Sequence, residues 1–138
     1  MSKGLEKHKH RSESLSYFGK DLVRRSGSHC ELCDASGTRL TVFEVPPVPK
    51  EAELFHCIFI CDTCRGQIEK PKTLNADHWR CLNTSAWSPE PAIQVMSVLL
   101  IDQLIANVKD NEWLQDLKEQ LYLTEEIQEW IDSAQSQK

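Results

Sequence analysis

Two Cys-x-x-Cys pairs are the residues whose type and spacing most directly predict chemistry in this sequence. Cys30 and Cys33 form the first pair, Cys61 and Cys64 form the second, and 27 residues lie between them. A Cys-x-x-Cys turn points two sulfur atoms at one spot, so two superposed turns offer four thiolates in tetrahedral geometry. This donor set is typical of a structural Zn²⁺ site, in which each Zn–S bond is about 2.3 Å long. We therefore predict that the four cysteines bind one Zn²⁺.

A structural role for this zinc is favoured over a catalytic one. A catalytic zinc needs an open or exchangeable coordination position, and four cysteine ligands leave none. A thioredoxin-like redox pair would use one Cys-x-x-Cys motif and leave the other without a role. We therefore predict that the metal replaces part of a hydrophobic core, and the sequence leans against an enzyme.

Two further cysteines stand outside this set. Cys57 lies four residues before Cys61, on the same face of an expected strand, and is interpreted as a small buried hydrophobic residue. Cys81 follows His78 and Arg80, which are candidate cations for activating a thiol, although packing is again the preferred interpretation. The alternative function is an enzyme or redox protein that uses Cys81 or His78.

The net charge of −5 is distributed unevenly along the chain. Residues 1–25 carry seven Lys/Arg and three Asp/Glu, a net charge of +4, whereas residues 89–138 carry three and ten, a net charge of −7. Only the N-terminal region is therefore expected to attract a polyanion such as nucleic acid. Residues 1–11 lack the apolar segment of a secretory signal, and paired thiols suit a reducing compartment, so we expect a cytoplasmic protein.

The segment between the two pairs is predicted to form a β-hairpin that superposes them. Residues 39–45 are rich in β-branched side chains and end at Pro46, and residues 54–60 form the expected return strand. A helix is predicted from about Ser12 to Arg25, and a shorter one over residues 65–69. These elements suit a zinc ribbon, or a treble clef in which the second pair lies at a helix N-terminus.

The remaining sequence predicts a small helical cluster packed on the metal module. A mostly apolar helix is expected over residues 89–108, with Ser88 as its cap, and Thr124 is expected to cap the last helix. Asp77 is expected to cap a short helix around Trp79. The predicted fold class is therefore small α+β. We divide it into a mobile basic arm (1–11), a zinc-binding module with an N-terminal helix (12–88) and a helical C-terminal part (89–138).

Six short motifs together resemble the PhnA-like proteins, a zinc-ribbon family named after the alkylphosphonate utilisation operon. The motifs are Cys30-Glu-Leu-Cys33, Val42-Phe-Glu-Val-Pro-Pro47, Cys61-Asp-Thr-Cys64, His78-Trp-Arg-Cys-Leu-Asn83, Ala86-Trp-Ser88 and Pro91-Ala-Ile-Gln-Val95. The resemblance spans residues 20–132 and implies a zinc-binding N-terminal module in a bacterial, cytoplasmic setting. It corresponds to the form without the C-terminal β-rich domain of longer members. Some members are labelled phosphonoacetate hydrolases, whose metal sites use Asp and His, and the sequence offers no such set.

A weaker resemblance links the region from Arg24 to Cys64 to the structural-zinc frame of HNH-type nucleases. Those enzymes bind a catalytic metal through a His pair on the hairpin and the following helix. Glu44 and Val45 occupy the hairpin position here, so the resemblance does not extend to a nuclease site.

The resulting expectation is a non-enzymatic zinc-binding module that works by interaction with nucleic acid or with a protein. A nucleic-acid binder should present a basic surface around Lys20, Arg24 and Arg25. An enzyme should present a pocket with His78 or Cys81 at its wall. A protein-binding module should instead leave an apolar patch uncovered near Trp113, Trp130 or Pro46-Pro47.

Overall fold

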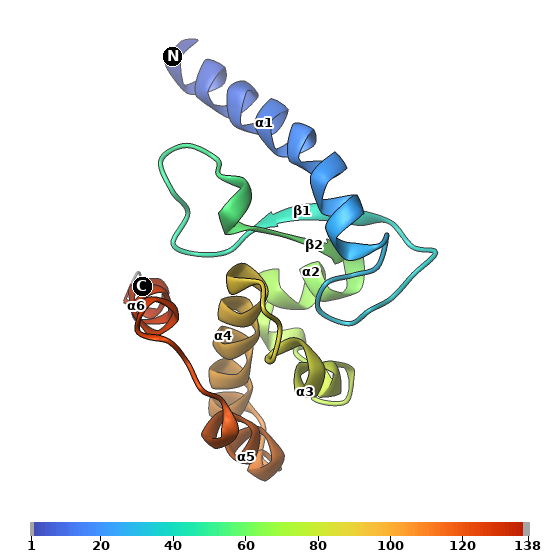
Figure 1. Ribbon diagram of the computed structural model, residues 1–138, viewed down its shortest axis with the longest axis vertical. Helices are drawn as coiled ribbons and strands as arrows, with labels where there is room; N and C mark the ends of the chain where they lie inside the picture. The colour runs from blue at the N-terminus through green and yellow to red at the C-terminus, as the bar shows by residue number, and fades with distance from the viewer. Residues whose placement is uncertain (1, 137–138) are drawn as a thin grey trace.

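A two-stranded hairpin lies between one long N-terminal helix and a group of C-terminal helices in the computed structural model (Figure 1). The structure describes residues 2–136, and the side chains of residues 9–136. Within that range it has six α-helices, three short 3-10 helices and two strands. The small α+β fold class predicted from the sequence is therefore confirmed, including the clustering of four cysteines expected of a zinc-binding module.

The hairpin is antiparallel and sets the position of the second cysteine pair. Strand β1 (Leu40–Glu44) pairs with strand β2 (Cys57–Cys61) in a register that places Leu40 opposite Cys61. Every residue of β2 is buried because its two faces have different partners. Ile58 and Ile60 belong to the main hydrophobic core, whereas Cys57 and Phe59 pack towards the N-terminal helix.

The first predicted strand is confirmed, but the second begins three residues later than expected. Residues Leu54–His56 form the 3-10 helix η1. The amide of His56 donates to the Glu53 carbonyl at 3.0 Å, and the amide of Cys57 donates to the Leu54 carbonyl. These two amides therefore have local acceptors, although the His56 carbonyl still accepts a hydrogen bond from the Val45 amide at 2.8 Å.

Helix α1 (Ser2–Ser26) crosses over one face of the hairpin (Figure 1). Its apolar side chains Leu15, Phe18 and Leu22 pack against the face of β2 that carries Cys57 and Phe59. The helix begins at Ser2 rather than near Ser12, so it includes residues 2–11. The expected mobility of that segment stays a prediction.

Arg11 anchors the N-terminal half of α1 to the hairpin and the loop that follows β1. Its guanidinium donates to the Glu44 carboxylate at 2.8 Å, to the Lys50 carbonyl at 3.0 Å and to the Pro49 carbonyl. These bonds hold the long helix against the hairpin at the end opposite Cys61.

A run of short helices connects the hairpin to the C-terminal cluster, and Trp79 is its completely buried anchor. Asp77 does not cap as expected: it has helical backbone angles, and its side chain makes no capping bond among the described residues. Its amide instead donates to the Asn75 side chain at 3.0 Å. The run consists of α2 (Asp62–Glu69), η2 (Pro71–Thr73), η3 (His78–Cys81) and α3 (Leu82–Ser85).

Helix α4 (Pro91–Asn107) is the central helix of the C-terminal part and contacts α3, α5, α6 and β2. It begins at Pro91 rather than Pro89, because Ser88 accepts a hydrogen bond from the amide of Glu90 and so closes a turn before the helix. Prolines at residues 89 and 91 both suit a first helical position, and the second one is used.

Two amphipathic helices, α5 (Glu112–Gln120) and α6 (Glu125–Gln135), pack against α4. Thr124 caps α6 as predicted and accepts a hydrogen bond from the amide of Ile127 at 3.3 Å. The indole of Trp130 donates to the Pro46 carbonyl at 2.8 Å and so ties α6 to the loop after β1. None of the described helices combines the length and the hydrophobicity that crossing a bilayer requires.

Candidate metal centre

The four cysteines of the two Cys-x-x-Cys pairs lie together, with their sulfur atoms all within 4.8 Å of one another. The Sγ atoms of Cys30 and Cys64 are 3.7 Å apart, and those of Cys33 and Cys61 are 3.6 Å apart. Zn–S bonds of about 2.3 Å at tetrahedral angles require sulfur atoms separated by about 3.8 Å. A disulfide needs a separation of about 2.05 Å, so the spacing fits one shared ion rather than bridges.

The first pair sits in a tight loop directly after α1. Gly27, Ser28 and Asp34 have positive φ values of 64°, 64° and 67°, which turn the chain twice within eight residues. The amide of Cys30 donates to the Ala35 carbonyl at 2.9 Å, and the amide of Cys33 donates to the Cys30 sulfur at 3.4 Å. Hydrogen bonds within the loop therefore hold both sulfur atoms on its inner side.

The second pair joins the end of β2 to the start of α2. Cys61 is the last residue of the strand and the N-cap of the helix, and its sulfur accepts a hydrogen bond from the amide of Cys64 at 3.5 Å. The partial positive charge of a helix N-terminus stabilises thiolates. This placement is the treble-clef-like arrangement, the second of the two geometries predicted from the sequence.

Burial makes the simultaneous ionisation of all four thiols unfavourable when no cation is bound. Three of the four cysteines are buried and Cys33 is partly exposed. Hydrogen bonds from Cys64 and from backbone amides lower the pKa of Cys30, whereas desolvation, followed by the nearby charge of Cys30, raises the pKa of Cys33 to about 12. The hydrogen bond to Cys30, with burial, also raises the pKa of Cys64. Only a bound metal ion would favour four thiolates together at neutral pH.

His78 lies against the cysteine cluster, and its Nε2 is 3.2 Å from the sulfur of Cys64. With the proton on Nε2, the imidazole donates to a thiolate at Cys64, as outer-shell groups at metal sites commonly do. Burial lowers the pKa of His78 and so favours the neutral ring. The sequence singled out His78 but gave no signal that it would meet Cys64.

Gln67 is the reason that His78 reaches this position. Its side-chain oxygen accepts hydrogen bonds from the Trp79 indole at 2.7 Å and from the Asn75 amide at 2.9 Å. Asn75 precedes η3 and Trp79 lies within it, so Gln67 on α2 holds η3 close to the cysteines of α2. Gln67 was not recognised in the sequence, and no pattern there distinguishes it from a solvated residue.

Glu31, inside the first Cys-x-x-Cys motif, is a second residue that the sequence interpretation missed. Its side chain is only 4% exposed and accepts a hydrogen bond from the amide of Phe59 at 2.8 Å. Its own amide donates to the Phe59 carbonyl at 2.8 Å. Glu31 therefore fixes the first cysteine loop to β2, the strand that ends in the second pair.

The two remaining cysteines lie outside the cluster. The thiol of Cys57 is fully buried and donates to the Glu53 carbonyl at 3.3 Å, and burial raises its pKa to about 12. Cys81 is partly buried, and burial raises its pKa to about 11. The packing roles expected of these two cysteines stay predictions.

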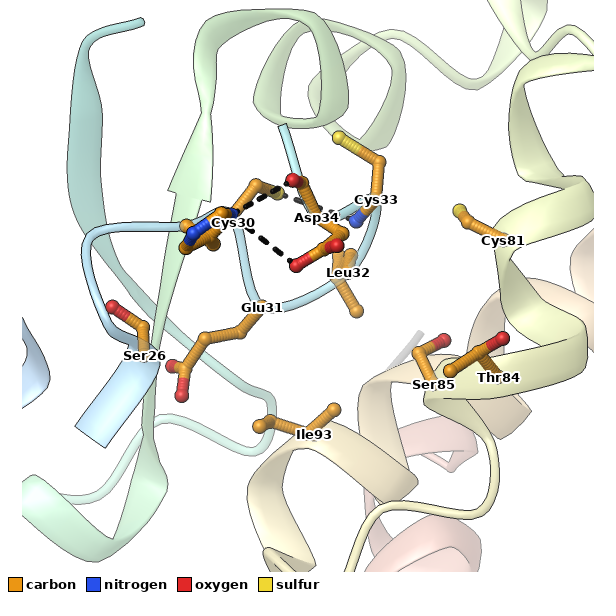
Figure 2. Close-up of a pocket in the computed structure, with 11 residues that line it drawn as sticks. Ser26, Cys30, Glu31, Leu32, Cys33, Asp34, Cys81, Thr84, Ser85 and Ile93 are labelled. Atoms are coloured by element: carbon orange, nitrogen blue, oxygen red, sulfur yellow. Dashed lines mark hydrogen bonds and ion pairs between the residues drawn. The ribbon is translucent and has the colours of Figure 1, made fainter. Parts of the chain in front are cut away.

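A cavity of about 400 Å³ opens beside the cysteine loop. Cys30, Cys33 and Asp34 line one side, and Cys81, Thr84 and Ser85 line the other, as Figure 2 shows. The cavity gives solvent a path to Cys33 and places Cys81 at a pocket wall, one of the arrangements expected of an enzyme.

The chain was compared with protein-family models, with curated proteins and with solved structures, and none of the three comparisons gave a match.

Proposed function

We propose that this chain is a zinc-binding, non-enzymatic interaction module of the PhnA-like kind, in which Zn²⁺ joins the first cysteine loop to the hairpin and α2. One observation carries the proposal. Four cysteine sulfur atoms gather within 4.8 Å of one another, and two pairs among them, at 3.7 Å and 3.6 Å, are close to the separation that a tetrahedral Zn²⁺ requires.

The chemistry of the donor set favours a thiolate-binding metal such as zinc over Ca²⁺ and Mg²⁺. Four thiolates in tetrahedral geometry suit Zn²⁺ or iron, whereas Ca²⁺ and Mg²⁺ prefer oxygen ligands. When bound, the ion supplies the positive charge that four crowded thiolates need. The amides of Cys33 and Cys64 orient two of the sulfur atoms by donating hydrogen bonds to them. His78 lies within hydrogen-bond distance of the Cys64 sulfur and orients a third.

Two observations favour interaction over catalysis. The four cysteines fill a tetrahedral coordination sphere, so no position is left for a substrate. The raised pKa of Cys81, about 11, keeps its thiol protonated at neutral pH and therefore weakly nucleophilic. A module whose metal has no free coordination position acts by presenting a binding surface, not by catalysing a reaction at the metal.

The second candidate function is an enzyme or redox protein linked to phosphonate metabolism that uses Cys81 or His78. It is favoured by the position of Cys81 at the wall of the cavity beside the cluster. Phosphate release from phosphonoacetate by the zinc-loaded protein, lost in Cys81→Ala, would support this candidate over the first.

Metal analysis of the purified full chain tests the first proposal. We expect one zinc per chain in the wild type and in Cys57→Ala, whose thiol lies outside the cluster. Cys61→Ser should retain far less zinc, because it removes both a ligand and the helix cap. Equal zinc in Cys61→Ser and wild type, or zinc loss in Cys57→Ala alone, would contradict the ligand assignment.

A further inference from the structure

A partly exposed aromatic pair, Phe55 and Trp130, lies where η1 meets α6. Phe55 is 59% exposed, although its ring stacks on Trp130 with centroids 5.6 Å apart and planes 30° from parallel. The hydrogen bond from Trp130 to the Pro46 carbonyl fixes the indole. His56 lies on the same ring at a centroid distance of 4.4 Å. The rings are therefore held in place before any partner arrives.

A cavity of about 320 Å³ adjoins this pair and separates it from the start of α4. Its apolar walls come from the aromatic pair and from residues at the starts of two helices. Phe55, Pro89, Pro91, Ile127 and Trp130 provide these walls. A concave apolar site beside fixed aromatic rings is the usual form of an anchor pocket at a protein interface.

Two polar side chains in this cavity, Glu126 and Gln94, offer hydrogen-bond acceptors. Glu126 contributes an exposed carboxylate. The amide nitrogen of Gln94 donates to the Ala86 carbonyl at 2.9 Å, which leaves its oxygen to accept. The hydroxyls of Ser88 and Thr124 also line the cavity; each accepts a backbone amide and keeps its O–H as a donor. Among the described residues, none of those lining the cavity is Lys or Arg.

The surface of α6 beside the cavity is negatively charged. Helix α6 carries the exposed acids Glu125, Glu126, Glu129 and Asp132, and the sequence has no Lys or Arg from residue 119 to residue 137. An occupant complementary to this surface must be cationic, rich in donors and flat enough to lie on an aromatic ring. A guanidinium has these properties: five N–H donors, no acceptor, a permanent charge and a planar face.

We infer that this cavity, together with the Phe55–Trp130 pair, binds an arginine side chain of a partner protein whose neighbouring residues are apolar. The guanidinium lies over the exposed face of Phe55 and donates to Glu126 and to the Gln94 oxygen, while the flanking apolar residues contact Pro91 and Ile127. This inference rests on the interaction function proposed above and names the chemistry of its partner.

The test uses the zinc-loaded full chain and two blocked tripeptides, Leu-Arg-Leu and Leu-citrulline-Leu. Citrulline keeps the shape of arginine but has no charge, so the pair separates charge recognition from apolar contact. The readout is the NMR signal of the Trp130 indole N–H, assigned by its absence in Trp130→Phe. We expect a saturable shift with the arginine peptide and at least about tenfold weaker binding of the citrulline peptide.

Variants locate the binding. Glu126→Gln and Phe55→Ala should each weaken binding of the arginine peptide by about five- to tenfold. Glu119→Gln, which changes an exposed acid on α5, should leave the affinity for the peptide unchanged. Equal binding of the two peptides would overturn the inference, as would wild-type binding by Glu126→Gln. So would finding that the surface instead binds a DNA oligonucleotide or a second copy of the chain.

Zinc content, measured on the same samples, separates the two proposals. A chain without zinc would contradict the metal function. A zinc-loaded, folded chain that does not bind the arginine peptide would contradict only the inference about this surface.

Discussion

Arg25 donates two hydrogen bonds to Glu31, one from Nε at 2.8 Å and one from Nη2 at 2.7 Å. The pair joins the last turn of α1 to the first Cys-x-x-Cys loop, and Nη2 also donates to the Cys57 carbonyl at 3.0 Å. Since Glu31 also accepts from the Phe59 amide, one carboxylate links α1, the cysteine loop and β2. The position of the loop therefore depends on this ion pair.

Glu31→Gln should destabilise the zinc-loaded protein by about 2 kcal/mol, because it leaves the charge of Arg25 poorly paired in a mostly buried place. The measurement is urea unfolding with zinc in excess. Glu69→Gln is the matched control, since its pair with Arg65 has a carboxylate that is 56% exposed, and it should change stability by less than about 0.5 kcal/mol. Equal effects of the two variants would show that the Glu31 pair has no special role.

The fold could be predicted in outline because its strongest patterns are local. Helix α4 is apolar on most sides, and β1 is rich in β-branched residues, so both were found close to their true positions. The 3-10 turn η1 was missed because Leu54 and Phe55 suit a strand equally well by residue type. What selects the turn is a set of local backbone bonds that hydrophobic periodicity does not record.

Only the part of the site that residue spacing defines, the four cysteines, could be predicted from the sequence. The two Cys-x-x-Cys motifs indicate four sulfur donors, and the hairpin brings them together. The contact between His78 and Cys64 depends on the path of the chain through η2 and η3, which Gln67 holds in place. Such a contact arises from tertiary packing, so it could not be predicted from the spacing of residues in the sequence.

His78→Ala should lower zinc affinity by about tenfold, because the Cys64 thiolate loses an outer-shell hydrogen bond. Competition with a chelator measures the affinity. Cobalt substitution adds a spectroscopic test, since the sulfur-to-cobalt charge-transfer band should shift when the bond is lost. His29→Ala is the control: its ring bonds to the Asp34 carbonyl at 3.2 Å, and its side chain is 44% exposed. If both variants match the wild type in affinity and spectrum, His78 does not act on the metal site.

Cys57 should make the protein less stable at alkaline pH. Burial, with a contribution from Glu44, raises its pKa from 9.0 to about 12. In the unfolded chain the thiol ionises near its ordinary pKa, so between pH 9 and pH 12 the unfolded state has lost a proton that the folded state keeps, and stability falls as pH rises. From pH 8 to pH 10 this thiol should cost about 1 kcal/mol. Denaturant unfolding at both pH values should show a smaller loss for Cys57→Ala; an identical loss would mean that Cys57 ionises normally in the folded protein.

Helix α1 should give the protein a weak and salt-sensitive attraction to nucleic acid. Lys9, Lys20 and Arg24 are exposed, and their spacing places them on the side of the helix opposite Leu22, which packs on the hairpin. Since the rest of the chain is acidic, binding should disappear at a few hundred millimolar salt, on the order of the screening expected for exposed charges.

Replacing Lys9, Lys20 and Arg24 together by Gln should abolish this binding or reduce its logarithmic salt slope by roughly three, about one for each lost phosphate contact. These substitutions keep Arg11, whose bonds to the Glu44 carboxylate and the Lys50 carbonyl hold the helix. Lys70→Gln with Lys72→Gln is the control, since both side chains are exposed but lie on η2 and its cap. Titration of single- and double-stranded DNA at several salt concentrations measures both slopes. Equal slopes for the triple variant and the wild type would exclude this face of α1 as the contact surface.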